Sequence, residues 1–66
     1  MQIVVNGHGE TVPEESTISS LVAIFREGDP HLIVEHNGRF VFPHLFAATV
    51  VAEGDRLEFI NPAFGG

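Results

Sequence analysis

The chain contains no cysteine and no lysine among its 66 residues. Without cysteine, no disulfide can brace the fold, and no thiolate can act as a nucleophile or a zinc ligand. A domain of this length is close to the lower limit for folding without such braces. Its core must therefore come from apolar packing alone, for which the hydrophobic fraction of 44% is sufficient. The lack of cysteine is also consistent with a cytosolic protein.

Positive charge is scarce as well. Three arginines stand against nine acidic residues, which gives a net charge of −6. Such a chain would be repelled by a phosphate backbone, so we expect no nucleic-acid partner. The charge would steer a partner with a basic surface towards the chain. The alternative is that it only keeps a small protein soluble.

Long hydrophobic runs are absent too. The opening "MQIVVNGHGE" has three adjacent apolar residues before polar and turn residues follow, unlike a signal peptide. No run approaches the roughly 18 apolar residues of a membrane span. We therefore expect a soluble, cytoplasmic protein without a membrane partner.

The residues at the start of the chain predict a hairpin. Residues 2–6 are β-prone, and the two-residue period puts Ile3 and Val5 on one face. The stretch "GHG" at 7–9 has turn chemistry. Residues 10–13, "ETVP", would then return as a short second strand that Pro13 ends.

A helix follows in "ESTISSLVAIFREGD". Ser16 or Thr17 can cap its start through a side-chain hydroxyl, and Gly28 can close its end in the left-handed conformation. Four apolar residues recur at i, i+3, i+4 and i+7 and are expected to form the face that packs on a sheet: Ile18, Leu21, Val22 and Phe25.

The second half predicts another hairpin and a last strand. Asn37-Gly38 lies between two β-prone runs, which is a strong two-residue turn signal. Residues 32–36 should therefore pair with 39–42. A short helical turn is expected around residues 45–48, and a further turn at Gly54-Asp55. In "RLEFIN", Leu57 and Phe59 alternate with charged residues, as in a half-buried strand.

The order of these elements is hairpin, helix, hairpin, turn and strand. It predicts an α+β fold with a mixed sheet of four to five strands and one main helix on one face. The first and last strands can lie side by side at the centre. This is the β-grasp, or ubiquitin-like, architecture. We expect residues 1–60 to form the β-grasp domain and residues 61–66 to form a flexible tail that ends in Gly-Gly.

The histidine and hydroxyl side chains of the sequence do not predict a metal site or a catalytic site. No two of the four histidines have the i, i+4 spacing of a helical metal-binding pair, so surface or loop positions are expected for His8, His31, His36 and His44. The hydroxyl residues near the helix are of the capping type. We expect no metal site and no cofactor held by the chain itself.

Several segments resemble the ThiS/MoaD family of sulfur carriers, and the ThiS branch most closely. They are spread over essentially the whole chain: "MQIVVNG", "STISSLV", "VEHNGRFV", "TVVAEGDRLEFI" and the final "GG". The middle segment and the "EGD" turn that leads to the last strand and the glycines are the most specific. The stretches "VFPHLF" and "NPAF" depart from the usual ThiS pattern, and the proline of the second is similar to the MoaD branch.

The resemblance implies a chemistry for the tail. In this family an E1-like enzyme adenylates the C-terminal carboxylate with ATP and magnesium, and a persulfide donor then converts it to a thiocarboxylate. By resemblance Gly66 carries the sulfur, and the chain is a protein cosubstrate and not an enzyme. Glycines suit such a tail, because a backbone without Cβ can enter a narrow channel. The tail residues expected to contact partners are Pro62, Ala63, Phe64 and Gly65.

The implied partners are a ThiF/MoeB-like adenylyltransferase, a persulfide sulfur donor and a sulfur acceptor such as a ThiG-like thiazole synthase. The acceptor stays open, because a MoaD-like role in molybdopterin synthesis or another pathway is an alternative. A non-reactive β-grasp binding module and a ubiquitin-like protein modifier are further alternatives. The oligomeric state and the roles of Phe42 and Phe46, in the core or against a partner, also stay open.

Overall fold

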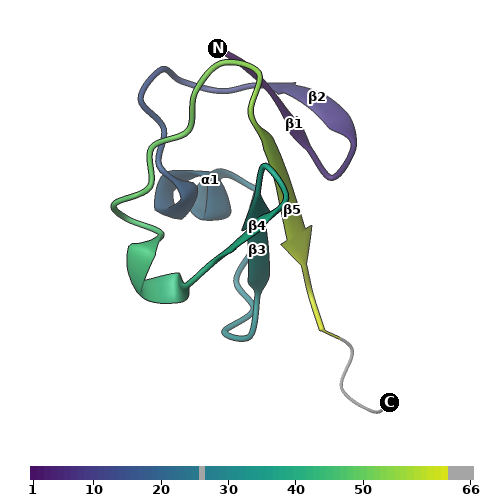
Figure 1. Ribbon diagram of the computed structural model, residues 1–66, viewed down its shortest axis with the longest axis vertical. Helices are drawn as coiled ribbons and strands as arrows, with labels where there is room; N and C mark the ends of the chain where they lie inside the picture. Colours follow the sequence, from purple (N-terminus) through teal and green to yellow (C-terminus); the bar gives the residue numbers. More distant parts are fainter. Residues whose placement is uncertain (26, 63–66) are drawn as a thin grey trace.

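The computed structural model describes residues 1–25 and 27–62. They form a five-stranded mixed sheet with strand order β2-β1-β5-β3-β4 (Figure 1). The central pair β1 and β5 is parallel, and the other neighbouring strands are antiparallel. The elements are β1 (Gln2–Val5), β2 (His8–Thr11), α1 (Ile18–Ile24), β3 (Ile33–His36), β4 (Arg39–Val41), the 3₁₀ helix η1 (Pro43–Leu45) and β5 (Arg56–Ile60). The predicted β-grasp architecture is confirmed.

Both hairpins turn at an Asn-Gly pair. Asn37 and Gly38 have φ of 52° and 82°, as predicted, and Asn6 and Gly7 have φ of 50° and 82°. Asparagine and glycine tolerate positive φ better than other residues, so this pair favours the two-residue hairpin turn. The prediction of a first turn at residues 7–9 is therefore wrong, because His8 already lies in β2 opposite Val5.

Helix α1 begins at a capping box. The Ser20 N–H donates to Thr17 Oγ1 at 3.1 Å, and the Thr17 N–H donates to Ser20 Oγ at 3.0 Å. Of the two predicted caps, Thr17 is the one used. The buried Ser16 instead donates its hydroxyl to the Pro13 carbonyl at 2.6 Å, which closes the loop before the helix.

The predicted helix end is wrong. Phe25 is the C-cap of α1, with φ of −88°, and Gly28 is not among the residues with positive φ. The Glu27 N–H donates to the Val22 carbonyl at 2.9 Å, so a backbone bond closes the last turn of α1 before Gly28. The helix is consequently shorter than its sequence pattern suggested.

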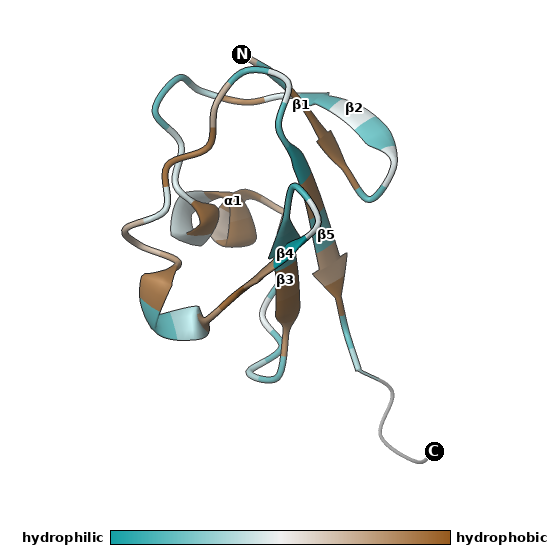
Figure 2. Cartoon of the chain, viewed as in Figure 1, coloured by the Kyte–Doolittle hydropathy of each residue, from teal (hydrophilic) through white to brown (hydrophobic). Residues whose placement is uncertain are grey.

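The core lies between α1 and one face of the sheet. Ile18 and Leu21 are fully buried, while Val22 and Phe25 are partly buried against the core, so the predicted helix face is confirmed. Hydrophobic residues follow α1, β3 and the end of β5 in Figure 2. Leu57 and Phe59 alternate with exposed neighbours along β5, as predicted. The other buried core residues are Ile3, Val5, Val12, Leu32, Val34, Val41 and Val51.

The long connection from β4 to β5 starts with η1, close to the helical turn predicted around residues 45–48. It then passes the start of α1, where the Ile18 N–H donates to the Thr49 carbonyl at 3.0 Å. Phe46 is partly buried against the core, whereas Phe42 is 56% exposed. The turn before β5 has Gly54 at φ of 84°, which confirms the turn predicted there.

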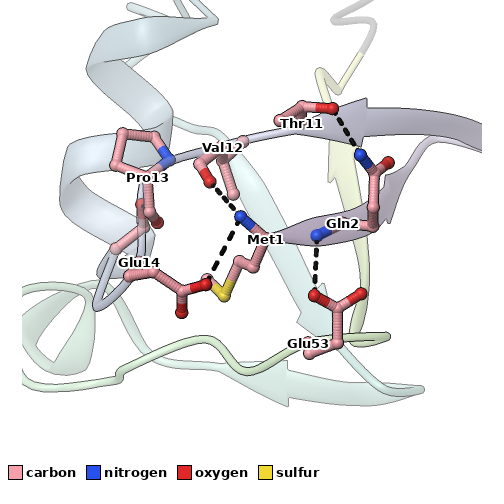
Figure 3. A network of polar contacts seen from close by, with 8 residues as sticks. Met1, Gln2, Thr11, Val12, Pro13, Glu14 and Glu53 are labelled. Carbon is pink, nitrogen blue, oxygen red and sulfur yellow. Dashed lines mark hydrogen bonds and ion pairs between the residues drawn. The ribbon is translucent and has the colours of Figure 1, made fainter.

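The start of the chain is part of the sheet (Figure 3). The Met1 amino group donates to the Val12 carbonyl at 2.7 Å, and the Val12 N–H donates to the Met1 carbonyl at 2.9 Å. The Gln2 N–H donates to Glu53 Oε1 at 3.0 Å. These bonds extend the β1–β2 pairing by one residue and tie β1 to the turn that precedes β5.

Candidate functional site

Strand β5 leads directly into the segment that carries the predicted reactive group. It runs parallel to β1 and ends away from Met1, at the far end of the sheet (Figure 1). Asn61 and Pro62 follow it. Asn61 Nδ2 donates to Glu27 Oε2 at 3.1 Å, so the first residue after β5 is bonded to the loop after α1.

The predicted tail residues Ala63, Phe64, Gly65 and Gly66 lie outside the described residues. Pro62 is described and is half-buried. The roles assigned to these five residues, and the boundary between domain and tail at residues 60 and 61, stay predictions.

Two asparagines hold β5 in place, one on each side. The Asn6 N–H donates to the Leu57 carbonyl at 2.9 Å, and Asn6 Oδ1 accepts from the Phe59 N–H at 2.7 Å. The Asn37 N–H donates to the Arg56 carbonyl at 2.8 Å, and Asn37 Oδ1 accepts from the Arg56 N–H at 2.8 Å. The strand that bears the tail is thus fixed at both hairpin turns.

Asp55 joins the turn before β5 to the second hairpin. Its Oδ2 accepts from the Ala52 N–H at 2.9 Å and lies 2.7 Å from His36 Nε2, and its Oδ1 accepts from Asn37 Nδ2 at 3.1 Å. Burial raises the pKa of the Asp55 carboxyl, but the hydrogen bonds from Ala52, His36 and Asn37 outweigh it and hold the pKa below its ordinary value of 3.8. The segments "VEHNGRFV" and "EGD", which carry the most specific resemblance, meet at this cluster.

The sheet face opposite α1 includes the last residue of β5, Ile60. Register places Phe40 of β4, Glu35 of β3 and Glu58 of β5 in one row across the strands. A second row pairs Ile33 of β3 with Ile60 of β5. We call this surface, made of Ile33, Glu35, Phe40, Phe42, Arg56, Glu58 and Ile60, the outer face. From the sequence, the role of Phe42 stayed open and the other six residues had no assigned role, although the inward alternation of Leu57 and Phe59 implies that Arg56, Glu58 and Ile60 point outwards.

Large apolar groups are exposed on the outer face. Phe40 is 50% exposed and Ile60 is 41% exposed. The Phe40 and Phe42 rings meet edge-to-face with centroids 4.9 Å apart, which resolves the open role of Phe42 in favour of the surface. A shallow pocket of about 180 Å³ lies beside them and is lined by Glu35, Gly38, Arg56 and Glu58. Exposed apolar side chains with polar groups at their rim are typical of a protein-binding surface.

The four histidines do not converge. His8 and His44 are exposed, and the His44 ring lies 5.9 Å from the Phe42 ring. His31 is exposed on the loop before β3. His36 lies in strand β3 and is half-buried against Asp55, so the prediction of a surface or loop position is wrong for it. Within residues 1–25 and 27–62, no group of three or more histidine or carboxylate side chains could hold a metal ion.

In the same part of the chain, no helix is both long and apolar enough to cross a bilayer. Exposed large apolar side chains also lie away from the outer face, at Ile24, Leu45 and Val50. The outer face is the candidate surface for a partner because it includes Ile60, which directly precedes Asn61.

A five-stranded mixed sheet in this strand order, with one helix packed on one face, defines the class of β-grasp, or ubiquitin-like, proteins. Comparison with known families identifies the family within this class to which the chain belongs. The model of the ThiS family matches residues 2–66. The chain therefore belongs to the ThiS family.

Solved structures agree with this assignment. The chain is similar to the crystal structure of the thiamine biosynthesis protein (ThiS) from Geobacter metallireducens, with 32% identity, a TM-score of 0.88 and 100% of both chains covered. A solution NMR structure of a thiamine biosynthesis protein from the same organism gives a TM-score of 0.82 at 32% identity, covering 100% of this chain and 88% of that one. A search of curated proteins returned no significant match.

Proposed function

We propose that this chain is a sulfur carrier of thiamin thiazole biosynthesis, with the Gly66 carboxylate as its reactive group. The observation that carries the proposal is the ThiS family match, which extends through residue 66. The similar structure from Geobacter metallireducens is that of a thiamine biosynthesis protein, which supports the thiamin pathway. The chain acts as a protein cosubstrate, and the catalytic groups belong to its partners.

The chemistry begins with activation of the carboxylate, which is a poor electrophile until one of its oxygens becomes part of a leaving group. A Gly66 oxygen attacks the α-phosphorus of magnesium-bound ATP in an E1-like ThiF/MoeB-type enzyme, and pyrophosphate leaves. A persulfide then attacks the acyl carbon of the adenylate, and AMP leaves with the bonding electrons. A thiol cleaves the resulting acyl disulfide and releases the thiocarboxylate.

The chain's own residues present the tail. The two asparagine clamps hold β5, and the Asn61–Glu27 hydrogen bond links the base of the tail to the loop after α1. Pro62 restricts the backbone just beyond this bond, which lowers the entropy lost when the following residues dock. Ala63, Phe64 and Gly65 then contact the activating enzyme, with Phe64 as an aromatic anchor. Because activation consumes ATP, we place the carrier in the cytoplasm.

The test uses the activating enzyme encoded in the same genome. With ATP and magnesium, the parent chain should support exchange of pyrophosphate into ATP. Adding a persulfide donor and a thiol should shift the intact mass by the replacement of one oxygen by sulfur. A ThiG-like thiazole synthase should then consume the thiocarboxylate, whereas consumption by a molybdopterin synthase large subunit would move the proposal to the MoaD-like pathway.

Two variants of different length distinguish the effect of the position of the terminal carboxylate from an effect on folding. Deletion of Gly66 retracts the carboxylate by about 3.3–3.6 Å of extended chain. Since a displacement of about 1 Å can cost roughly 10²-fold in a positioned reaction, this variant should fold normally and fail to exchange pyrophosphate. A variant with one alanine after Gly66 should fail as well. Normal exchange by both variants would refute the reactive carboxylate and favour a non-reactive binding module.

A further inference from the structure

The two hairpin turns contain the same reactive dipeptide. Asn6-Gly7 and Asn37-Gly38 are both exposed, and each asparagine has positive φ. Asparagine followed by glycine is prone to deamidation, because the glycine nitrogen has no side chain beside it to hinder its attack on the asparagine side chain. Apart from chain neighbours, no described atom lies within 4 Å of a Cβ built on either glycine, so space for the reaction is open at both turns.

The turns differ in how the asparagine amide nitrogen is held. Asn37 Nδ2 donates to Asp55 Oδ1 at 3.1 Å, whereas within residues 1–25 and 27–62 Asn6 Nδ2 donates to no group of the chain. This nitrogen is the leaving group in deamidation. At Asn37 its departure would break a hydrogen bond to a charged acceptor and leave a carboxylate oxygen beside that of Asp55. The hydrogen bond that each Oδ1 accepts from β5 restrains both side chains alike.

A histidine lies beside the first turn. His8 Nδ1 is 3.1 Å from the Asn6 carbonyl oxygen, and Nδ1 is the donor because a carbonyl oxygen only accepts. This carbonyl belongs to the peptide group that contains the Gly7 nitrogen. A hydrogen bond to it stabilises the negative charge that the peptide group acquires when this nitrogen loses its proton. Arg39 has the corresponding position after the second turn, and in the described part of the chain it makes no such bond to the Asn37 carbonyl.

We propose that Asn6 is a site of spontaneous deamidation that His8 assists. Asn37, which Asp55 restrains, is its protected counterpart. The Gly7 nitrogen loses its proton and forms a bond to Asn6 Cγ, the bond from Cγ to Nδ2 breaks, and Nδ2 takes up a proton and leaves as ammonia. Water then opens the resulting succinimide ring. Attack of water at the side-chain carbonyl gives aspartate, and attack at the main-chain carbonyl gives isoaspartate.

The two products affect β5 differently. Aspartate at residue 6 keeps an oxygen in the position of Oδ1, so the Phe59 N–H retains its acceptor. Isoaspartate carries the backbone through the former side chain, which lengthens the turn and removes this oxygen from its position. The isoaspartyl form therefore loses one of the two asparagine clamps on the strand that leads into the tail. The reaction limits how long a molecule keeps β5 fully clamped, whatever the tail itself does.

The test follows both asparagines in the same molecules. The intact folded chain is incubated in neutral buffer, and mass spectrometry of its proteolytic fragments measures the replacement of the amide NH₂ group by OH at each asparagine. Asn6 should react at least about tenfold faster than Asn37, because only Asn37 loses a hydrogen bond to a charged group. In urea the two rates should be similar. An isoaspartyl methyltransferase should label residue 6 of the folded, incubated chain.

Two substitutions assign the difference between the sites. His8→Phe keeps a flat ring without a donor and should slow the reaction at Asn6 by about two- to tenfold, with Asn37 unchanged. His8 is exposed in edge strand β2, so this variant should fold like the parent, which circular dichroism checks. Asp55→Asn replaces the charged acceptor by a neutral one and should accelerate the reaction at Asn37 relative to Asn6.

Each asparagine is the control for the other. Equal rates at Asn6 and Asn37 in the folded chain would overturn the proposal. A difference that persists in urea would assign it to the local sequence and would overturn the structural explanation. An unchanged rate at Asn6 in His8→Phe would exclude the assistance by His8. Equal acceleration of both sites by Asp55→Asn would indicate a general loosening of the fold and would exclude the specific protection of Asn37.

Discussion

Asn6 Oδ1 accepts a hydrogen bond from the Phe59 N–H at 2.7 Å, so a side chain of the first hairpin turn completes the hydrogen bonding of the last strand. Asn37 does the same for the Arg56 N–H on the other side of β5. Each asparagine has positive φ, at which the chain turns away and its own carbonyl leaves the neighbouring strand. The side-chain amide oxygen takes the place of that carbonyl.

Substitutions at Asn6 should separate the contribution of the Asn6–Phe59 hydrogen bond to stability from that of the left-handed backbone at Asn6. Asn6→Gly keeps the left-handed backbone but leaves the Phe59 N–H without its acceptor, which costs about 1–3 kcal/mol. Asn6→Ala loses the bond and adds roughly 1–2 kcal/mol of left-handed strain. Asn6→Asp keeps an acceptor and should lie closest to the parent. Urea midpoints of the three variants measure the order, and equal midpoints for alanine and glycine would show that the turn carries no strain.

The pH dependence of the free energy of unfolding should reflect the ionisation of the Asp55 carboxyl group. Its folded-state pKa lies below 3.8, so its contribution is fully present above about pH 3.8 and is lost as the pH falls through the lower folded value. Asp55→Asn should therefore be less stable than the parent near neutral pH, by about 1.5–3 kcal/mol. The difference should shrink in acid below pH 3.8. Urea unfolding across this range tests it, and a difference independent of pH would exclude the carboxylate charge as the cause.

Leu21→Asp should unfold the domain. Leu21 is 0% exposed, and an unpaired charge in its place is costly. A domain of this length has about 3–10 kcal/mol of total stability, and even removal of a buried leucine side chain to alanine costs about 2–5 kcal/mol. The control is Ala23→Asp on the exposed side of α1, which should melt within a few degrees of the parent. Circular dichroism on heating distinguishes the two, and similar melting of both variants would contradict the packing of α1.

The capping box offers a milder test. Thr17→Ala removes the acceptor of the Ser20 N–H and should cost about 1 kcal/mol. Thr17→Ser retains the hydroxyl and should cost only a few tenths of that amount. The free energy of unfolding from denaturant titration measures both. Equal losses for the two variants would assign the effect to the threonine methyl group and not to the cap.

Local patterns predicted most of the fold. The spacing of Ile18 and Leu21 identified the buried side of α1, and Asn37-Gly38 identified the second hairpin. The first hairpin was misplaced because "NGHG" offers two overlapping turn signals, and the Asn-Gly pair determined the turn. Gly28 was wrongly predicted as the helix end, because α1 ends at the C-cap Phe25 and a local backbone bond from the Glu27 N–H to the Val22 carbonyl closes its last turn.

The candidate site was less accessible to prediction. Its tail residues were assigned by resemblance, whereas the outer face depends on register. That Glu35 meets Glu58 and Phe40 follows only when β3 pairs with both β4 and β5 in one alignment. His36 was expected at the surface or in a loop, because its contact with Asp55 joins residues that are 19 positions apart in the sequence and depends on the fold.

The central position of β5 has a consequence for the synthesis of this protein. Residues 1–55 alone would hold the β1–β2 and β3–β4 hairpins without the strand that joins them. A nascent chain therefore cannot complete its sheet until residues 56–60 have left the ribosome, and the segment from residue 61 onwards emerges last. Two-stranded hairpins are marginal on their own, so an interrupted chain stays unfolded and open to proteolysis. A partner that recognises the finished sheet thereby selects only molecules whose translation has passed the final strand.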